Sequence, residues 1–296
     1  MNIEDVIIIG AGPGGLATAL QLKRYGINPL VFEQEKIGGL LHNANLVENY
    51  PGFPGGISGP ELVQQFKDQV QDLSITITHA RVEELNYLEN KFRATTAKQV
   101  YQSQTVVIAT GTKPRLFSDL EIPVDLQDQV YYEVYPLLDL HGKRIAIIGA
   151  GDAAFDYALN LGKSNDILII NRGDQISCLP LLWERARRSH RIQYFQNTRI
   201  SQLSSIPDRK MALECSTPTG HNILMVDILI GAIGRDPQLD FVSGQFAEKA
   251  IQLESSGDLY YVGDVVNGLY RQTAIAVGDG ILTAMKIYGR LKEKDK

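Results

Sequence analysis

The sequence predicts an α/β protein built from two doubly wound domains, and two observations support this prediction. First, one pattern occurs twice: an apolar strand, a glycine-rich turn, a helix and a second apolar strand. It reads DVIIIGAGPGGLATALQLKRYGINPLVFE near the start of the chain and KRIAIIGAGDAAFDYALNLGKSNDILIINR in the middle. Second, the strands of both copies are continuous apolar runs, which is typical of parallel strands buried on both faces. Each copy is therefore predicted to form a βαβ unit at the front of its own domain.

The other segments can be assigned in chain order. The stretch 74–111 alternates polar and apolar residues like a small antiparallel meander and ends in a buried strand. The next residues, TKPRLFSDLEIPVDL, carry prolines and few periodic apolar residues, which indicates a connection out of the first domain. A second strand-rich stretch ends in VDILIGAIGRDP, and the C-terminal stretch reads as a strand, a glycine loop and a long helix. Periodicity alone does not assign this last part to either domain.

Length and charge narrow the class of protein. The chain has 296 residues, enough for two domains of ordinary size, and its formal net charge of −5 does not favour a nucleic-acid partner. The longest apolar runs are too short to cross a bilayer, so no membrane partner is expected. The acidic start MNIEDVIIIG leads directly into a strand, so we expect no signal or transit peptide and a cytoplasmic location.

Cysteine and histidine usage argues against a metal centre. Cys178 and Cys215 are the two cysteines of the chain, and they stand too far apart in sequence for a CxxC motif or a metal knuckle. The five histidines show no ligand spacing. The sequence therefore predicts no metal site, and so few thiols fit a reducing compartment.

The first glycine turn is predicted to bind a dinucleotide. Gly10, Gly12 and Gly15 follow a strand and open a helix, where glycines let the backbone approach a pyrophosphate and the helix N-terminus offers free N–H groups. Glu33 closes the second strand, where a carboxylate can accept hydrogen bonds from a ribose diol.

The second glycine turn follows the same pattern, but the residue at the end of its second strand differs. Gly149, Gly151 and Ala154 form the GxGxxA variant, but the second strand ends at Asn171 and Arg172 without a carboxylate. A neutral residue followed by arginine can accommodate a 2′-phosphate, which favours NADPH over NADH, although Arg172 also fits a solvent-facing strand end. Two dinucleotide sites on one chain suggest that a hydride arrives on one nucleotide and that a flavin at the other site receives it.

Seven motifs together resemble a known family over essentially the full length. They are GAGPGG, GGLL, VENYPGFPGGISGPELVQQF, VVIATGTKPR, GAGDAAFDYA, VGDV and YRQTAIAVGDG, in the order and spacing of the low-molecular-weight thioredoxin reductases. The resemblance implies two doubly wound (Rossmann-like, three-layer ββα) nucleotide-binding domains, the second inserted into the first. The FAD-binding domain would comprise residues 1–115 and 244–296, and the NAD(P)H-binding domain residues 116–243. It also implies a homodimer.

The resemblance further implies cofactor contacts. The glycine turn and Glu33 would hold the ADP half of FAD, Asp264 would bind the ribityl hydroxyls, and Arg271 would lie beside a helix N-terminus that faces the N1/O2 side of the flavin. The full set expected at FAD is Gly10, Gly12, Pro13, Gly14, Gly15, Glu33, Gln34, Gly38, Gly39, Leu40, Asn49, Val82, Ala109, Thr110, Gly111, Gly263, Asp264, Arg271, Gln272 and Thr273. The set expected at NADPH is Gly149, Gly151, Asp152, Ala153, Ala154, Arg172 and Ser177.

The chain departs from the family where the redox CxxC would stand. Aligned without a gap on the second glycine turn, that motif falls on Tyr132-Glu133-Val134-Tyr135. A tyrosine can neither form nor attack a disulfide, so the family's route to thioredoxin is not expected. Tyr132 and Tyr135 are therefore candidates for the flavin face, where a phenol can stack on the ring or offer an O–H group, and simple packing is the alternative.

Two further departures concern nucleotide contacts. The family's HRRDxxR reads NRGDQIS here, which keeps Arg172 but replaces two arginines by Gly173 and Ser177. Weak NADPH affinity or a vestigial site would follow. Leu40 and HNAN also stand where the family has a glutamine and threonines.

The leading hypothesis is a flavoprotein oxidoreductase that passes electrons directly to an external acceptor, with NADPH as donor. The partner would be a small redox protein or a small-molecule acceptor. Three alternatives stay open: a ferredoxin or flavodoxin–NADP reductase, a reductase of an external disulfide like the bacilliredoxin reductases, and a flavin-binding sensor that has lost NADPH turnover.

Overall fold

The computed structural model describes residues 3–207 and 210–294, and the chain divides into two compact units. Unit 1 takes its described residues from Met1–His42, Val47–Lys113 and Asp236–Lys296, and unit 2 from Asn43–Leu46 and Pro114–Arg235. The two crossing segments, β7 (Thr112–Pro114) and β16 (Arg235–Pro237), pair as a two-stranded sheet.

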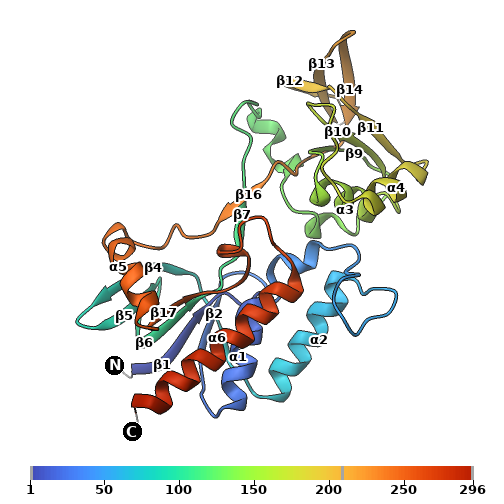
Figure 1. Ribbon diagram of the computed structural model, residues 1–296. Coiled ribbons are helices and arrows are strands. Elements are labelled where there is room, and N and C mark those ends of the chain that lie inside the picture. Colours follow the sequence, from blue (N-terminus) through green and yellow to red (C-terminus); the bar gives the residue numbers. More distant parts are fainter. Residues whose placement is uncertain (1–2, 208–209, 295–296) are drawn as a thin grey trace. The chain divides into compact units, whose positions relative to one another are not determined.

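The sheet of unit 1 has the strand order β3-β2-β1-β6-β5-β4, and β17 also pairs with β6 (Figure 1). Its strands are β1 (Ile3–Ile9), β2 (Leu30–Glu33), β3 (Ile77–His79), β4 (Val82–Leu88), β5 (Lys91–Thr96), β6 (Val100–Ile108) and β17 (Leu259–Tyr261). Strand β6 belongs to two layers, because residues 100–103 pair antiparallel with β5 and residues 106–108 pair parallel with β17. The parallel strands β3, β2, β1, β6 and β17 thus form one layer, and the meander β4-β5-β6 forms another.

Helices supply the third layer of unit 1. They are α1 (Pro13–Arg24), α2 (Gly59–Asp72) and α6 (Thr273–Lys294), with 3₁₀ turns η1 (Gly39–Asn43) and η4 (Gly263–Val265). Helix α5 (Gly244–Ser255) lies instead on the meander side of the parallel sheet, where it contacts β4 and β17. Helix α2 begins with a capping box, in which the Ser58 hydroxyl accepts from the Glu61 N–H and the Glu61 carboxylate accepts from the Ser58 N–H. Helices α1 and α6 pack closely, because Gly280 of α6 lies directly against the Gly14 carbonyl oxygen of α1.

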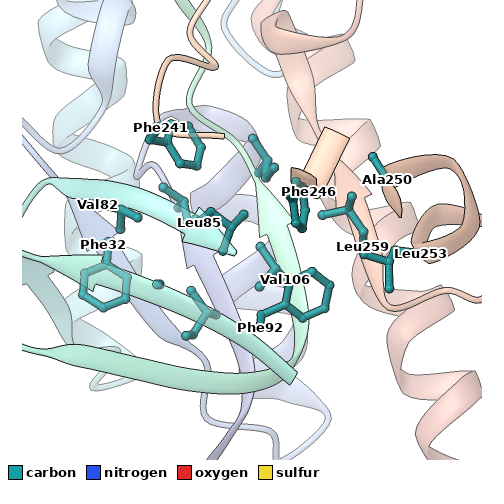
Figure 2. Packing of buried hydrophobic residues seen from close by; sticks show 14 of the residues in the cluster. Phe32, Val82, Leu85, Phe92, Val106, Phe241, Phe246, Ala250, Leu253 and Leu259 are labelled. Atoms are coloured by element: carbon teal, nitrogen blue, oxygen red, sulfur yellow. The ribbon is translucent and has the colours of Figure 1, made fainter. Parts of the chain in front are cut away.

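The core of unit 1 joins the meander to the parallel sheet. Figure 2 shows Phe92 of the meander beside Val106 of β6, and Val82, Leu85 and Phe246 of α5 belong to the same cluster. All five side chains are at most 5% exposed, so this layer contact is a main source of hydrophobic stabilisation in the unit.

Unit 2 repeats the same three layers. Its parallel sheet has the order β11-β10-β9-β15-β8 and its meander the order β12-β13-β14. The elements are η2 (Val124–Gln129), β8 (Val130–Tyr131), η3 (Tyr135–Leu137), β9 (Arg144–Ile148), α3 (Asp152–Leu161), β10 (Asp166–Ile170), α4 (Pro180–Arg188), β11 (Ile192–Phe195), β12 (Arg199–Ile206), β13 (Lys210–Thr217), β14 (Gly220–Val226) and β15 (Ile228–Gly231).

Alternate residues of each parallel strand in unit 2 enter different cores. Ile167 and Ile169 of β10 face α3, where they meet Phe155, whereas Leu168 and Ile170 face the meander. Both faces are therefore buried, as the continuous apolar run of this strand predicts. The doubly wound α/β fold with three layers is confirmed.

Several segments differ from the expected layout. Residues 43–46 and 114–115, expected in the first domain, lie in unit 2. Strand β3 falls within the predicted meander but pairs parallel with β2, because period-two alternation does not distinguish an edge strand of the parallel sheet from a meander strand. Residues 236–243, expected in the second domain, lie in unit 1, where the Gln238 N–H donates to the Gly111 carbonyl at 3.0 Å. The C-terminal stretch also lies in unit 1, because β17 extends its parallel sheet.

Within the described ranges, no helix has the length and hydropathy needed to span a bilayer. The same residues contain no group of three or more His, Cys, Asp and Glu side chains that could hold a metal ion.

Candidate functional site

The three glycines of the first turn are explained by three different structural features. Gly10 has φ +106°, and a Cβ on it would lie 2.4 Å from the Ala109 carbonyl oxygen. A Cβ on Gly15 would lie 1.9 Å from the Gly10 oxygen, so this glycine allows close packing of helix on strand. A Cβ on Gly12 would meet no described atom within 4 Å, so the space in front of it is open. No described side chain caps α1 after Gly12, and the turn can therefore bring backbone N–H groups to an anion.

Glu33 is held in place beside this turn. Its side chain is buried, and its two carboxylate oxygens accept from the Ala11 N–H at 2.8 Å and the Glu35 N–H at 2.9 Å. A carboxylate has about four acceptor sites, so two such bonds orient the group and leave capacity for a ribose diol.

A cavity of about 60 Å³ adjoins Glu33 in unit 1. Gly10, Glu33, Gln34, Val82 and Thr110, five of the residues expected at FAD, line it. Six further lining residues were not predicted from the sequence, namely Ile9, Phe32, Ala80, Arg81, Gln238 and Phe241. Gln238 is fixed there because its carbonyl accepts from the Thr110 hydroxyl at 2.7 Å.

The GG pair after β2 packs onto the first glycine turn. The Gly38 N–H donates to the Ala11 carbonyl at 2.8 Å, and a Cβ on Gly38 would lie 2.5 Å from the Val63 side chain. A Cβ on Gly39 would lie 3.6 Å from the Gly12 Cα, so the two glycine segments meet. Leu40 follows in η1 and is partly buried.

Three chain segments converge at the start of α1. A Cβ on Gly14 would lie 2.7 Å from the Val262 side chain and 3.2 Å from the Ala276 oxygen of α6. The same position lies 3.7 Å from the Gly263 nitrogen in η4. The α1 N-terminus, the turn carrying Asp264 and the first turns of α6 therefore lie side by side in unit 1.

The residues expected at the flavin ring also meet within unit 1. The Asn49 amide donates to the Gln272 side-chain oxygen at 2.6 Å. Gln272 directly precedes α6, and its carbonyl accepts the N–H of Ala276 at 3.0 Å. Thr273 is thus the first residue of α6, and Arg271 precedes Gln272, so the order expected for a helix N-terminus is present. Ala109 follows β6, and its N–H donates to the Ile9 carbonyl at 2.8 Å.

The second glycine turn repeats these contacts in unit 2. Gly149 has φ +149°, and a Cβ on it would lie 2.4 Å from the Ala232 oxygen. Gly151 precedes α3, which no described side chain caps, and Asp152 and Ala153 are exposed in its first turn. Ala154 is fully buried in the third position. The Ser177 N–H and hydroxyl donate to the Ala150 oxygen at 2.9 and 3.1 Å, so residue 177 closes over the turn.

Asn171 stands where Glu33 stands in unit 1, but its amide is committed elsewhere. It donates to the Gln175 carbonyl and to the Tyr194 hydroxyl, both at 2.9 Å, and its oxygen accepts from the Gly173 N–H at 3.1 Å. The buried amide therefore shapes the loop that carries Arg172, whose side chain is exposed.

Tyr132 and Tyr135 have different surroundings. The Tyr132 hydroxyl accepts from the Phe117 N–H at 3.1 Å, and a Cβ on Gly231 would lie 2.7 Å from the Tyr132 ring. This partly buried side chain thus packs against Gly231 of unit 2. Tyr135 begins η3 and is partly buried, and its N–H donates to the Asn43 side-chain oxygen at 2.9 Å.

A polar cluster surrounds the segment between the two tyrosines in unit 2. Glu133 forms an ion pair with Arg235 at 2.7 Å and also accepts from the Asn43 amide. Burial raises the pKa of Asp156 to about 6, although the Asn45 N–H donates to its carboxylate at 2.9 Å. No sequence pattern predicts this cluster, because Asn43, Glu133 and Arg235 lie far apart in the chain.

The chain matches the pyridine nucleotide-disulphide oxidoreductase family over residues 4–280. It belongs to this family.

Individual relatives agree with this family. The thioredoxin reductase of Mycolicibacterium smegmatis is 29% identical over 315 aligned positions, which cover 99% of this chain and 98% of that protein. The structure of Lactococcus lactis thioredoxin reductase is similar with a TM-score of 0.84 at 24% identity, covering 98% of this chain and 99% of that one. The bacillithiol disulfide reductase of Staphylococcus aureus is similar in fold, with a TM-score of 0.75 at 20% identity and 100% coverage of both chains.

As a member of the pyridine nucleotide-disulphide oxidoreductase family, the chain is an FAD-dependent oxidoreductase, and the thioredoxin reductase-like family uses FAD and NADPH. The residues of unit 1 fit FAD, because the open space at Gly12, the uncapped start of α1, the oriented Glu33 and the adjoining cavity lie together. Unit 2 offers a second uncapped helix start after a glycine turn, with a neutral residue in the carboxylate position.

Proposed function

We propose that this chain is an NADPH-dependent flavoprotein oxidoreductase that delivers electrons directly from FAD to an external acceptor, without a disulfide of its own. Bound FAD would accept a hydride, two electrons with one proton, from NADPH and pass both electrons to the acceptor. Unit 1 would hold FAD and unit 2 would hold NADPH.

The state of the cysteines carries this proposal. Cys178 and Cys215 both lie in the described part of the chain, and both are free thiols. Burial raises the pKa of each thiol, so neither is a ready thiolate at neutral pH. Thiol–disulfide exchange needs a thiolate and a second sulfur within reach, and the YEVY segment provides neither.

The proposal assigns roles to residues of both units. Glu33 would accept from the ribose of FAD, and Asp264 would bind the ribityl chain. The α6 N-terminus at Thr273 would stabilise negative charge on the flavin. In unit 2, Arg172 would bind the 2′-phosphate of NADPH from the loop that Asn171 shapes.

The proposal can be tested by stopped-flow mixing of the FAD-loaded protein with NADPH under anaerobic conditions. We expect loss of flavin absorbance within seconds, followed by reoxidation when an acceptor is added. The acceptor screen should include a ferredoxin, a flavodoxin, a quinone, free flavin, dioxygen and low-molecular-weight disulfides, with NADH as second donor. A flavin that NADPH does not bleach would contradict the proposal and favour the sensor alternative.

The matched control removes both thiols. A Cys178→Ala, Cys215→Ala double variant should retain the rate of flavin reduction and the rate of acceptor turnover, because no step passes through sulfur of this chain. Loss of acceptor turnover in a variant that still binds FAD and is still reduced by NADPH would show that an internal thiol takes part.

Reduction of an external disulfide is the second candidate. This candidate is consistent with the similarity in fold to the bacillithiol disulfide reductase. That similarity by itself is evidence for the fold alone. Pro13 and Gly14 occupy the first glycine turn, so an attacking sulfur is missing from that turn in this sequence. Turnover with a disulfide as the sole acceptor would support this candidate, and turnover with a ferredoxin or flavodoxin alone would support the ferredoxin–NADP reductase alternative.

We also propose a homodimer in the cytoplasm. The observation that supports a dimer is an apolar surface on unit 1. Residues of α1, α2 and α6, among them Ile281, line a cavity of about 470 Å³, and α6 also exposes Leu282 and Met285. Light scattering after gel filtration should give twice the chain mass of 32.8 kDa. A monomer at micromolar concentration would contradict the proposal.

A further inference from the structure

Asp279 connects helix α6 to the turn that precedes it. It lies in the second turn of the helix, and one carboxyl oxygen, Oδ2, accepts from the Gly263 N–H at 3.2 Å and from the Asn267 amide at 2.6 Å. Both donors belong to the connection between β17 and α6. A single side chain on the helix therefore fixes both ends of this connection's turn, at residues 263 and 267.

The turn held in this way carries Asp264. It is closed by its own backbone, since the N–H groups of Val266 and Asn267 donate to the Gly263 carbonyl at 3.0 and 3.2 Å. Gly263 has φ +75°, a conformation that costs a side-chain-bearing residue energy. These internal bonds define the shape of the turn but do not attach it to α6. The Asp279 carboxyl provides such an attachment.

We propose that Asp279 is a positioning residue for FAD: it holds the 263–267 turn in the orientation that presents Asp264 to the cofactor. Asp279 itself does not touch the cofactor. Its removal leaves two donors in a partly buried place without their acceptor, so the turn samples other orientations. Cofactor binding then has to restore the order that the carboxyl group maintains in the native chain, and affinity falls. The inference rests on FAD binding by unit 1 and is independent of the electron acceptor.

The test compares FAD affinity with the stability of the apoprotein in four full-length variants. Asp279→Ala removes the acceptor, Asp279→Asn keeps an acceptor oxygen without the charge, and Asn267→Ala removes the shorter hydrogen bond without altering α6. Glu248→Ala, an exposed carboxylate on α5, is the matched control. FAD binding is followed by the change in flavin fluorescence on titration of the apoprotein, and apoprotein stability by urea unfolding.

We expect Asp279→Ala to raise the Kd for FAD at least about tenfold, which corresponds to about 1.4 kcal/mol. Asp279→Asn should stay within about threefold of the parent because its oxygen can accept both bonds. Asn267→Ala should fall between the two, and Glu248→Ala should not change the Kd. At saturating FAD, the visible absorption bands of Asp279→Ala should shift relative to the parent, because the ribityl contact is altered.

Three results would overturn the proposal. The first is a parental Kd in Asp279→Ala. The second is a weakened Kd that the unfolded fraction of the apoprotein fully accounts for, which is the result of a merely structural role. The third is an Asp279→Asn variant as weak as Asp279→Ala with a native fold, because the acceptor oxygen would then be irrelevant. If Asp279→Ala does not fold, the Kd of Asn267→Ala for FAD becomes the test, and an unchanged Kd in that variant overturns the proposal.

Discussion

Glu33 and Asn171 occupy matching positions of the repeat, but their side chains bond to different parts of the chain. The Gly10 N–H donates to the Phe32 carbonyl at 2.8 Å, and the Gly149 N–H donates to the Ile170 carbonyl at 3.1 Å. Residues 33 and 171 each follow the accepting residue and therefore occupy equivalent positions. The carboxylate turns toward its glycine turn, whereas the amide turns into its own loop. One change of residue type thus separates an oriented carboxylate from a neutral amide, which is the difference expected between a site for a ribose diol and a site for a 2′-phosphate.

Arg172 should therefore decide between the two pyridine nucleotides. We expect Arg172→Ala to raise the KM for NADPH roughly tenfold, equivalent to about 1.4 kcal/mol, and to leave the KM for NADH nearly unchanged. Steady-state kinetics with both donors measures this difference. Arg187→Ala, an exposed arginine on α4, is the control. An equal rise in KM for NADPH and for NADH would mean that Arg172 does not bind the 2′-phosphate.

Asp156 should make unit 2 less stable as the pH rises. Burial raises its pKa from 3.8 to about 6 in the folded state, so folding favours the protonated form. Its stabilising contribution is complete below pH 3.8 and is lost as the pH rises through 6. At pH 7.5, Asp156→Asn should raise the free energy of unfolding by up to about 3 kcal/mol.

The measurement is urea unfolding between pH 5 and 8. Asp139→Asn, at an exposed position of the same unit, serves as control. A parental pH slope in Asp156→Asn would show that another group causes the dependence.

At the scale of elements, the contact between α1 and α6 holds together three segments that carry residues expected at FAD. A Cβ on Gly280 would lie 2.3 Å from the Gly14 oxygen and 3.0 Å from the Thr18 nitrogen, both backbone atoms. Backbone cannot move aside cheaply, so Gly280→Ala should lower the free energy of unfolding by about 1–3 kcal/mol and weaken FAD binding.

Gly289→Ala provides a matched control in the same helix. A Cβ on Gly289 would meet no described atom within 4 Å, so the higher helix propensity of alanine should stabilise α6 by up to about 1 kcal/mol. Urea unfolding and FAD titration of both variants measure the difference. A Gly280→Ala variant as stable as the parent would mean that α6 can shift away from α1.

Helices and strands could be predicted from the sequence where the spacing of apolar residues and the residues of the flanking turns indicate the same element. The βαβ units, the meander at 82–108 and the long C-terminal helix follow from apolar spacing and glycine turns. Strand β3 and the 236–243 segment did not follow, because their place depends on pairing with distant residues such as Val31 and Gly111. Local pattern carries no information about such partners.

At the scale of the whole molecule, each unit has a hydrophobic core of its own. Phe92 and Phe246 belong to the cluster of unit 1, and Phe155 and Leu213 belong to the two clusters of unit 2. Calorimetry of the apoprotein should therefore show two transitions. FAD at 100 times its Kd should stabilise the transition of unit 1 by about 2.7 kcal/mol and leave the other in place. Equal shifts of both transitions would show that the units unfold together.

The candidate site was predictable in part for the same reason. Glycine turns and Glu33 are local signals, and their roles follow from backbone chemistry. Gln238, Asn267 and Asp279 act through contacts with residues far away in sequence or through a turn whose shape the sequence does not show. The packing of Tyr132 on Gly231 likewise depends on two strands that only the fold brings together.

The pairing of β7 with β16 has a consequence for engineering. Neighbouring strands lie about 5 Å apart, so the chain leaves unit 1 and re-enters it at nearly one point. A short hairpin loop in place of residues 115–234 would keep every position assigned to FAD on one shortened polypeptide. Another nucleotide-binding domain could be inserted at the same junction, so that the same FAD-binding unit could be combined with different electron donors.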